Sequence, residues 1–243
     1  MRRFGLIGYP LSHSFSQKYF TDKFDREGIH NCRYDNFPIA SISQLKNIIA
    51  DNPDLEGLNV TIPYKVQVIP LLDESKDLPV GACNCIKISA GKLSGYNTDV
   101  IGFERSLRSR LQPNHHRALI LGKGGASEAV RYVLKKLNIE FTQVSRDPSP
   151  GELPYDQLTD KIIRDHLLII NCTPLGMYPD IEGLPPIPYS AIGVNHFLFD
   201  LIYNPDRTLF LLQGEQRGAL VQSGLDMLVI QAEESWRIWN RKD

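Results

Sequence analysis

A short apolar segment that leads into a glycine-rich turn limits the fold of this chain more than any other feature. Residues 118–121 are all apolar, as expected of a strand buried on both faces of a parallel sheet. Gly122-Lys123-Gly124-Gly125-Ala126 follows at once, and the spacing of apolar residues predicts a helix over 127–137. A strand, a glycine turn and a helix in this order are typical of a doubly wound α/β unit.

Short apolar segments and helical segments also alternate along the rest of the chain. Strands are predicted at 3–7, 32–37, 57–60, 140–144, 167–171 and 197–201, and a hairpin at 85–96 around Ala90-Gly91. Further helices are predicted at 16–26, 42–50, 99–111 and 223–239. This alternation predicts the α/β class.

Composition argues against several classes of partner. The 243 residues carry a formal net charge of −1, whereas a nucleic-acid-binding chain normally shows a basic stripe. The apolar residues at the N-terminus are too few for a signal peptide, and no apolar segment reaches transmembrane length. Cys32, Cys83, Cys85 and Cys172 fit neither a disulfide framework nor a zinc spacing. We expect a cytoplasmic protein with reduced thiols, without a metal, and with neither nucleic acid nor membrane as a partner.

The glycine turn has the composition of a loop that binds the pyrophosphate of a dinucleotide. Glycines allow a close backbone approach, and the N-terminus of the following helix offers N–H groups and a positive dipole end. The pattern departs from Gly-x-Gly-x-x-Gly because Ser127 stands at the last position. The alternative is a strand-to-helix turn that binds no ligand.

The end of the next predicted strand, Val144-Ser145-Arg146-Asp147, bears on the choice of cofactor. Arg146 offers a planar set of donors that suits the extra phosphate of NADP, and Ser145 adds a hydroxyl. Asp147 could instead bind ribose hydroxyls or repel that phosphate. The segment favours NADP(H) and leaves NAD open.

Lys65 and Asp99 are the predicted proton-transfer pair. Reduction of a ketone places negative charge on its oxygen, and a positioned donor must supply a proton. Both residues stand in short polar segments, with Asn59, Thr61, Asn84 and Asn97 as hydrogen-bonding neighbours. The alternative for either residue is a solvated surface charge.

Two serines precede the first predicted helix, in Ser12-His13-Ser14-Phe15-Ser16. The hydroxyls of Ser14 and Ser16, with the helix N-terminus behind them, could hold a carboxylate, whereas an ordinary helix cap needs only one serine. His13 has no evident partner and is expected to be structural. Near the C-terminus, Tyr203 follows a strand, and Gly224 and Gln231 belong to the start of the last helix.

Taken together, these motifs resemble those of the shikimate dehydrogenase family, from Gly8 to about Trp239. The resemblance rests on Gly8-Tyr9-Pro10-Leu11-Ser12-His13-Ser14-Phe15-Ser16, Asn59-Val60-Thr61-Ile62-Pro63-Tyr64-Lys65, Gly81-Ala82-Cys83-Asn84, Gly95-Tyr96-Asn97-Thr98-Asp99, Gly122-Lys123-Gly124-Gly125-Ala126, Asn171-Cys172-Thr173-Pro174-Leu175-Gly176-Met177, Asp200-Leu201-Ile202-Tyr203-Asn204-Pro205 and Gly224-Leu225-Asp226-Met227-Leu228.

The resemblance implies a reaction and an architecture. The reaction is the reversible reduction of 3-dehydroshikimate to shikimate with NADPH, a step towards the aromatic amino acids. The architecture has two α/β domains: a substrate-binding and catalytic domain at 1–99, completed by the C-terminal helix at 222–243, and a Rossmann-type doubly wound NADP domain at 100–221. The sequence leaves a monomer and a homodimer open.

The resemblance also implies a role for each matching residue. Lys65 would be the catalytic acid and base, with Asp99 beside it. Substrate would be bound by Ser14, Ser16, Asn59, Thr61, Asn84, Tyr203 and Gln231. Cofactor would be bound by Gly122, Lys123, Gly124, Gly125, Ala126, Ser145, Arg146, Ile202 and Gly224.

The chain departs from the family pattern at four positions. Gln17 stands where proline is common, Cys85 replaces a threonine, and Ser145 and Ser223 each replace an asparagine. Three rivals follow: a quinate/shikimate dehydrogenase that uses NAD or NADP, a folate-type methylene dehydrogenase, and a non-catalytic NADP-binding regulator of the same fold. The two serines favour shikimate, and the presence of both Lys65 and Asp99 argues against the regulator.

Overall fold

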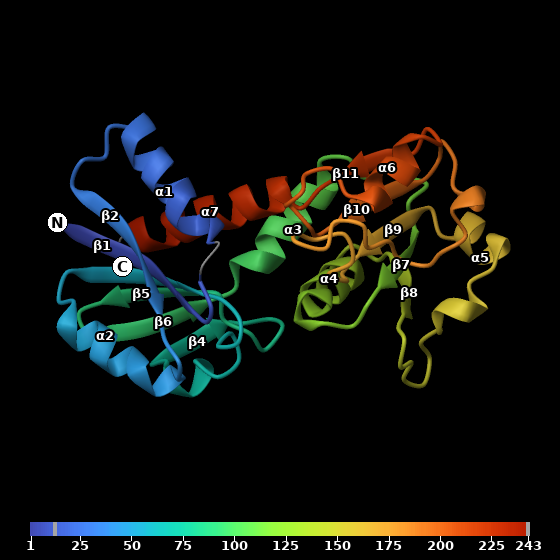
Figure 1. Cartoon of the computed structure of the whole chain (residues 1–243). Helices are drawn as coiled ribbons and strands as arrows, with labels where there is room; N and C mark the ends of the chain where they lie inside the picture. Colours follow the sequence, from blue (N-terminus) through green and yellow to red (C-terminus); the bar gives the residue numbers. More distant parts are fainter. Residues whose placement is uncertain (12–13, 242–243) are drawn as a thin grey trace. The chain divides into compact units, whose positions relative to one another are not determined.

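The computed structural model describes residues 1–11 and 14–241, which form two compact units (Figure 1). The first unit contains Met1–Thr98 together with Ala232–Asp243, and the second contains Asp99–Gln231. The division falls inside two helices, α3 (Thr98–Arg108) and α7 (Leu225–Asn240). The first seven residues of α7 therefore belong to the second unit and the rest of that helix to the first.

A six-stranded mixed sheet forms the centre of the first unit. Its strand order is β2-β1-β3-β5-β6-β4, with β1, β2 and β3 parallel to one another and β5 antiparallel to both of its neighbours. The strands are β1 (Arg2–Gly8), β2 (Cys32–Pro38), β3 (Leu55–Val60), β4 (Glu74–Asp77), β5 (Cys85–Ser89) and β6 (Lys92–Tyr96). The helices are α1 (Phe15–Arg26) and α2 (Leu45–Asp51), with 3-10 turns at Ile42–Gln44 and Ile69–Leu71.

Both faces of this sheet are covered. On one face α1 and the end of α7 bury an aromatic cluster in which Phe4 stacks on Trp239, with ring centroids 4.8 Å apart. The indole N–H of Trp239 donates to the carbonyl of Ile86 at 3.0 Å. Gly57 gives the indole room, because a Cβ there would lie 2.3 Å from the indole nitrogen. On the other face, α2 packs over aliphatic side chains such as Leu58.

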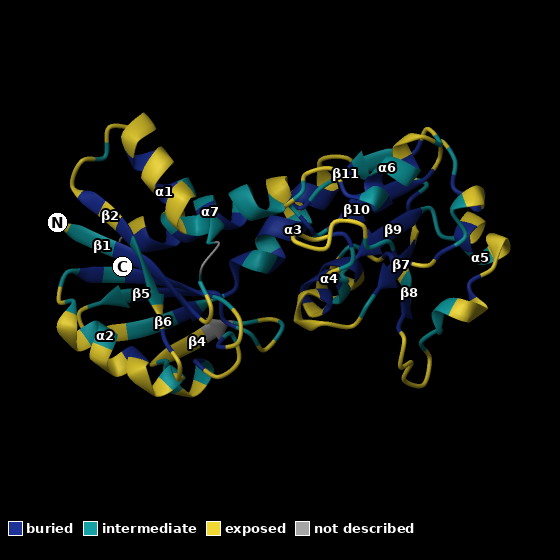
Figure 2. Cartoon of the chain, in the orientation of Figure 1, coloured by how far each residue is buried: buried dark blue, intermediate teal, exposed yellow. Residues whose placement is uncertain are grey.

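The second unit has an all-parallel, five-stranded sheet in the order β11-β10-β9-β7-β8. The strands are β7 (Arg117–Leu121), β8 (Glu140–Val144), β9 (Leu168–Asn171), β10 (Phe197–Asp200) and β11 (Leu220–Gln222). The helices besides α3 and the start of α7 are α4 (Gly125–Lys136), α5 (Asp160–Asp165) and α6 (Leu209–Glu215), with 3-10 turns at Tyr155–Gln157 and Tyr189–Ala191. The central strands β9 and β10 are buried throughout, and so is β7 after its first residue, whereas the edge strands β8 and β11 are partly exposed (Figure 2).

Strand order reverses between β7 and β9, because the chain runs outward from β7 to β8 and then returns to β9 on the other side. Ligands of open parallel sheets bind outside the carboxyl ends of the strands at such a reversal. The glycine turn follows β7, so this fold places the turn at the expected position. The predicted α/β class with a Rossmann-type doubly wound unit is confirmed.

Predicted and observed elements differ mainly where segments are short. The predicted helix at 42–50 begins as a 3-10 turn, because Ser41 and Gln44 form a capping box before α2 starts. Strand β4 has the sequence ESKD and β11 has only three residues, so neither shows a readable apolar alternation. Within residues 1–11 and 14–241, no helix has the length and apolar character needed to cross a membrane.

Candidate functional site

The glycine turn of the second unit leaves the N-terminus of α4 accessible. Gly122 has φ +93°, and a Cβ there would lie 2.8 Å from Cγ2 of Thr173. Gly124 is the N-cap residue of α4, and Cβ atoms at Gly124 and Gly125 would meet no described atom within 4 Å. An anion can therefore approach the N–H groups and the positive dipole end of this 12-residue helix.

A buried glutamine holds the turn from the neighbouring strand. Gln143 pairs with Ile120 in the register of β7 and β8. Its Nε2 donates to the carbonyl of Gly122 at 2.8 Å and to Oγ of Ser127 at 3.4 Å. Ser127 in turn donates to the carbonyl of Gly124 at 2.7 Å. The shape of the turn therefore depends on a side chain from a different strand.

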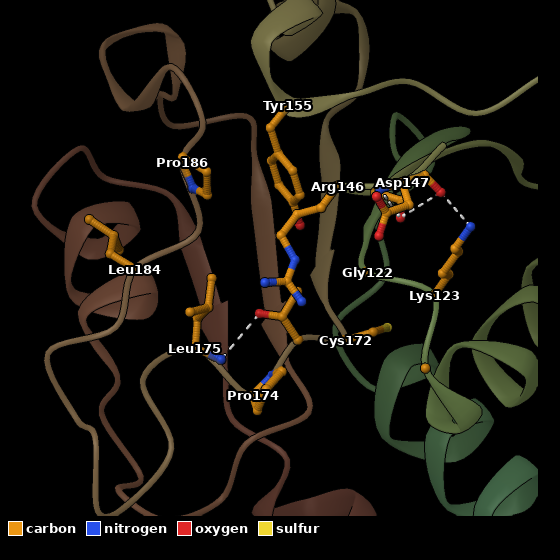
Figure 3. A pocket seen from close by; sticks show the side chains of 13 residues that line it. Gly122, Lys123, Arg146, Asp147, Tyr155, Cys172, Pro174, Leu175, Leu184 and Pro186 are labelled. Carbon is orange, nitrogen blue, oxygen red and sulfur yellow. Dashed lines mark hydrogen bonds between the residues drawn. The ribbon is translucent and has the colours of Figure 1, made fainter. Parts of the chain in front are cut away.

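A cavity of about 590 Å³ lies beside the turn, at the carboxyl ends of β7, β8 and β9 (Figure 3). Arg146 and Tyr155 line it and lie next to each other in Figure 3. Arg146 is exposed and forms no ion pair with another described residue. The hydroxyl of Tyr155 is buried without a hydrogen-bond partner among the described residues, and burial raises the pKa of Tyr155 to about 12. An accessible helix N-terminus and a guanidinium in one cavity suit a ligand with several phosphates.

Two of the predicted cofactor-binding side chains contact the loop that follows β8. Oγ of Ser145 accepts a hydrogen bond from the backbone N–H of Asp147 at 3.3 Å. Nζ of Lys123 donates to the carbonyl of Asp147 (Figure 3). It also donates to Oγ of Ser149 at 3.3 Å. The Lys123 ammonium therefore lies at the loop after β8 and not over the N-terminus of α4.

A buried carboxylate fixes the segment that contains Ile202 and Tyr203. Asp200, at the end of β10, accepts hydrogen bonds from Nδ2 of Asn171 at 3.1 Å and from Oγ1 of Thr208 at 2.6 Å. It also accepts one from the N–H of Ile202 at 3.1 Å. Burial raises the pKa of Asp200 to about 6, and these three hydrogen bonds limit the rise.

The structure brings Ile202 and Gly224 together. The N–H of Gly224 donates to the carbonyl of Ile202 at 2.9 Å. A Cβ at position 224 would lie 2.2 Å from the carbonyl oxygen of Leu201, so only glycine fits there without displacement of the backbone. Burial also raises the pKa of Tyr203.

Asp99 and Gln231 lie on two helices that pack closely within the second unit. Helices α3 and α7 come close together at Gly102 of α3. A Cβ at this position would lie 2.7 Å from the carbonyl of Met227 and 3.1 Å from Cβ of Gln231. Asp99 lies one turn before Gly102 on α3. Gln231 is buried, and its Nε2 donates to the carbonyl of Leu228 at 3.1 Å.

Three predicted residues of the first unit lie where the central strand β3 ends and its neighbour β5 begins. Thr61 follows β3, and the N–H of Val60 donates to the carbonyl of Asn84 at 2.9 Å. Half-buried Lys65 lies nearby, because its carbonyl accepts a hydrogen bond from the N–H of Cys83 at 2.7 Å. Lys65 belongs to the first unit and Asp99 to the second, and their action as a pair stays a prediction.

Asn59 and Asn84 are both buried and hydrogen-bonded within the first unit. Oδ1 of Asn84 accepts from the N–H of Thr98 at 2.6 Å, which fixes the residue before Asp99. Asn59 accepts from the Tyr34 hydroxyl at 2.9 Å, and its Nδ2 donates to Oγ of Ser235 at 2.9 Å and to the carbonyl of Asn84 at 3.2 Å. The Asn59 amide therefore helps to hold the backbone of Asn84 in place.

The serines of the first unit differ in their surroundings. Ser14 is the N-cap residue of α1, but its hydroxyl does not cap the helix. That hydroxyl is buried and has no hydrogen-bond partner among the described residues. Ser16 lies close enough to Tyr34 to oppose the rise that burial causes in the pKa of that tyrosine. Ser12 and His13 lie outside the described residues, so the expectation for His13 stays a prediction.

The sequence analysis did not identify the residues whose hydrogen bonds fix the predicted ligand-binding residues in place. Asn171 and Asp200 end two apolar strands, and a polar residue at a strand's carboxyl end is a signal that could have identified them. Gln143 and Ser235 have no such signal, because each acts on a residue far away in the sequence.

Comparisons with known proteins cover both units. The family model described as the shikimate dehydrogenase substrate binding domain matches residues 6–86. The shikimate dehydrogenase (NADP(+)) of Methanococcus maripaludis is 38% identical over 258 residues, which is 98% of this chain and 91% of that protein.

Solved structures of related enzymes have a similar fold over nearly the whole length of this chain. The shikimate dehydrogenase of Aquifex aeolicus has a TM-score of 0.85 and 33% identity, covering 99% of this chain and 92% of that one. The quinate dehydrogenase of Corynebacterium glutamicum, in complex with NAD, has a TM-score of 0.86 and 26% identity, covering 98% of this chain and 93% of that one.

Proposed function

The chain belongs to the shikimate dehydrogenase family, and on this premise we propose that it catalyses the reversible NADPH-dependent reduction of 3-dehydroshikimate to shikimate. The observation that carries the proposal is the 38% identity to a shikimate dehydrogenase (NADP(+)) over 98% of the chain. The reaction is a step towards the aromatic amino acids. We propose further that the protein acts in the cytoplasm as a monomer or a homodimer.

The proposed division of labour assigns one function to each part of the chain. Residues 1–99, completed by the C-terminal helix at 222–243, would bind substrate and carry out proton transfer. Residues 100–221 would bind the dinucleotide. The strand reversal and the accessible N-terminus of α4 support the second assignment.

NADPH, when bound, supplies the hydride. The Lys65 ammonium donates a proton to the substrate oxygen as negative charge develops there, and the Asp99 carboxylate accepts from the ammonium and orients it. In the reverse direction the neutral amine of Lys65 accepts the hydroxyl proton. The Asn84–Thr98 hydrogen bond supports this role for Asp99, because it fixes the residue just before it.

Substrate binding is assigned to hydroxyl, phenol and amide groups. Ser14 and Ser16 would hold the carboxylate, and the buried hydroxyl of Ser14, which has no partner among residues 1–11 and 14–241, is a donor suited to that purpose. Thr61, Asn84, Tyr203 and Gln231 would contact the ring hydroxyls. Asn59 would act on substrate through Asn84, since three hydrogen bonds already engage its amide.

Cofactor binding is assigned to the cavity of the second unit and the segment beside it. Gly122, Gly124, Gly125 and Ala126 would contact the pyrophosphate through the backbone at the start of α4, and Ile202 and Gly224 would lie near the nicotinamide. Arg146 would bind the adenosine ribose phosphate, with Ser145 shaping the loop beneath it.

The nearest rival is a quinate dehydrogenase that uses NAD. Asp147, which lines the cavity, is the residue that favours it, because a carboxylate can accept from ribose hydroxyls. Absorbance at the nicotinamide band, with shikimate or quinate each paired with NADP⁺ or NAD⁺, separates the cases. We expect turnover with shikimate and NADP⁺. Comparable rates with quinate or NAD⁺ would indicate the broader enzyme, and no turnover would indicate a non-catalytic regulator.

A further inference from the structure

Lys123 is the only charged residue of the glycine turn, and its ammonium lies over the loop that follows β8. Nζ donates to the carbonyl of Asp147 and to Oγ of Ser149, and it lies 3.7 Å from Oε2 of Glu152. The same loop contains Arg146, which lines the cavity together with Lys123 and Asp147 (Figure 3). The ammonium therefore stands at the end of the cavity where β8 stops.

The cavity lining at this end has a net positive charge, which a bound phosphate needs, only because Lys123 is present. The lining carries two cations, Lys123 and Arg146, and one carboxylate, Asp147. Without the lysine, the charges of Arg146 and Asp147 would cancel. The lining would then offer no net positive charge to a phosphate that carries nearly two negative charges. Glu152 adds a second carboxylate behind Lys123, which makes the lysine still more necessary.

The present contacts of Lys123 leave it able to reach a ligand. Its side chain is 41% exposed, and an ion pair this exposed contributes little to stability. A lysine also carries its charge on a flexible four-carbon stem. Nζ can therefore exchange a backbone carbonyl for a phosphate oxygen at small cost.

We propose that Lys123 is a specificity-determining residue whose ammonium, together with the Arg146 guanidinium, binds the phosphate on the 2′-oxygen of the adenosine ribose and so selects NADP(H) over NAD(H). The inference rests on the proposed dinucleotide site and does not depend on which substrate is reduced. It also gives this chain a means to offset Asp147, the residue that would otherwise favour NAD.

A purely structural role makes a different prediction. If Lys123 only ties the loop after β8 to the glycine turn, its loss weakens every adenine nucleotide to the same extent. If it contacts the 2′-phosphate, its loss weakens only ligands that carry that phosphate. Two fragments with the same adenosine and the same 5′-phosphate position, 2′,5′-ADP and 5′-AMP, distinguish these possibilities.

The experiment is calorimetric titration of both fragments into the full-length protein and three variants. We expect the wild type to prefer 2′,5′-ADP and Lys123→Met to lose that preference by about tenfold or more, as for one hydrogen bond to a charged group. Affinity for 5′-AMP should stay unchanged. Lys123→Arg should retain most of the preference, and Lys135→Met, an exposed lysine at the far end of α4, should match the wild type.

An equal loss for both fragments, or no loss for either, would overturn the assignment. Parallel shikimate assays separate it from the proposed function. If the wild type prefers 2′,5′-ADP in a Lys123-dependent way and yet does not turn over shikimate, the proposed reaction is contradicted and the role of Lys123 is supported. If shikimate is turned over and Lys123→Met still prefers 2′,5′-ADP to 5′-AMP, the proposed reaction is supported and the role of Lys123 is contradicted.

Discussion

Gln143 donates a hydrogen bond to the carbonyl of Gly122 at 2.8 Å and thereby ties the glycine turn after β7 to the carboxyl end of β8. The amide is buried, with 5% of the residue exposed, so its removal leaves the Gly122 carbonyl without this partner. Because the turn carries the proposed pyrophosphate site, its shape and the affinity for dinucleotide should depend on this side chain.

Replacement of Gln143 by Leu should weaken NADPH binding by about tenfold and lower the free energy of unfolding by about 1–3 kcal/mol, the cost of a buried polar group that loses its partner. Fluorescence titration of NADPH and urea unfolding measure the two effects. Gln216→Leu, at an exposed glutamine after α6, is the matched control. Unchanged NADPH affinity in Gln143→Leu would show that the turn keeps its shape without the brace.

Lys65→Ala should reduce turnover about 10²- to 10⁴-fold, the usual contribution of a positioned general acid. Asp99→Asn should also reduce it, because the amide keeps the shape of the carboxylate but not its charge. NADPH affinity should not change in either variant. Lys92→Ala, at an exposed lysine that starts β6, controls for loss of a positive charge. A normal rate for Lys65→Ala would refute the proposed mechanism.

Asp200 should make the stability of the protein fall as the pH rises from 4 to 6. Burial raises the pKa of this carboxyl from 3.8 to about 6, so the folded state holds a proton that the unfolded state has already released. The stabilising contribution is complete below pH 3.8 and is lost as the pH rises through about 6. The difference corresponds to about 3 kcal/mol.

Urea unfolding of the wild type and of Asp200→Asn, at pH values from 4 to 7, measures this contribution as the change in their difference. The Asn side chain can still accept hydrogen bonds from Asn171 and Ile202, so the variant should fold. A constant difference across this range would mean that Asp200 titrates alike in the folded and unfolded states.

His115 should have the opposite effect at mildly acidic pH. Its Nδ1 accepts from the N–H of Gln112 at 3.1 Å, and Nε2 lies 3.2 Å from the carbonyl of Asn195, an arrangement that needs the neutral ring. Burial lowers its pKa, and the hydrogen bond to the Asn195 carbonyl opposes part of that shift. The unfolded state therefore gains a proton first, and stability is lost as the pH falls below about 6.5.

Thermal unfolding of the wild type and of His115→Gln between pH 5 and 8 tests this expectation. The wild type should lose more stability than the variant as the pH falls below about 6.5. His30→Gln, at an exposed histidine of the first unit, is the control. Parallel curves for the wild type and His115→Gln would contradict the assigned role.

Features that depend on neighbours in the sequence were predicted well. The apolar segment at 118–121, the glycine turn and the helix after it form β7, the turn and α4, because each depends on local apolar spacing and on the freedom of glycine. The hairpin around Ala90-Gly91 formed for the same reason, and both of its turn residues have positive φ.

The side chains that support the site were not predicted, because each acts across the fold. Gln143 reads as an ordinary strand residue until the register of β7 and β8 places it beside Gly122. Asn59 reads as a substrate ligand until Ser235, 176 residues later, takes its amide. Lys123 reads as part of a phosphate loop until its ammonium is found on the loop after β8.

The sequence by itself determined the family, the class of fold and the chemical groups available for reduction of a small acid, since these follow from residue types and short-range order. Only the tertiary structure decided which polar groups are free to meet a ligand and which hold other residues in place. The physical reason is that a buried polar side chain must find a partner, and the partner is supplied by whichever strand or helix the fold brings beside it.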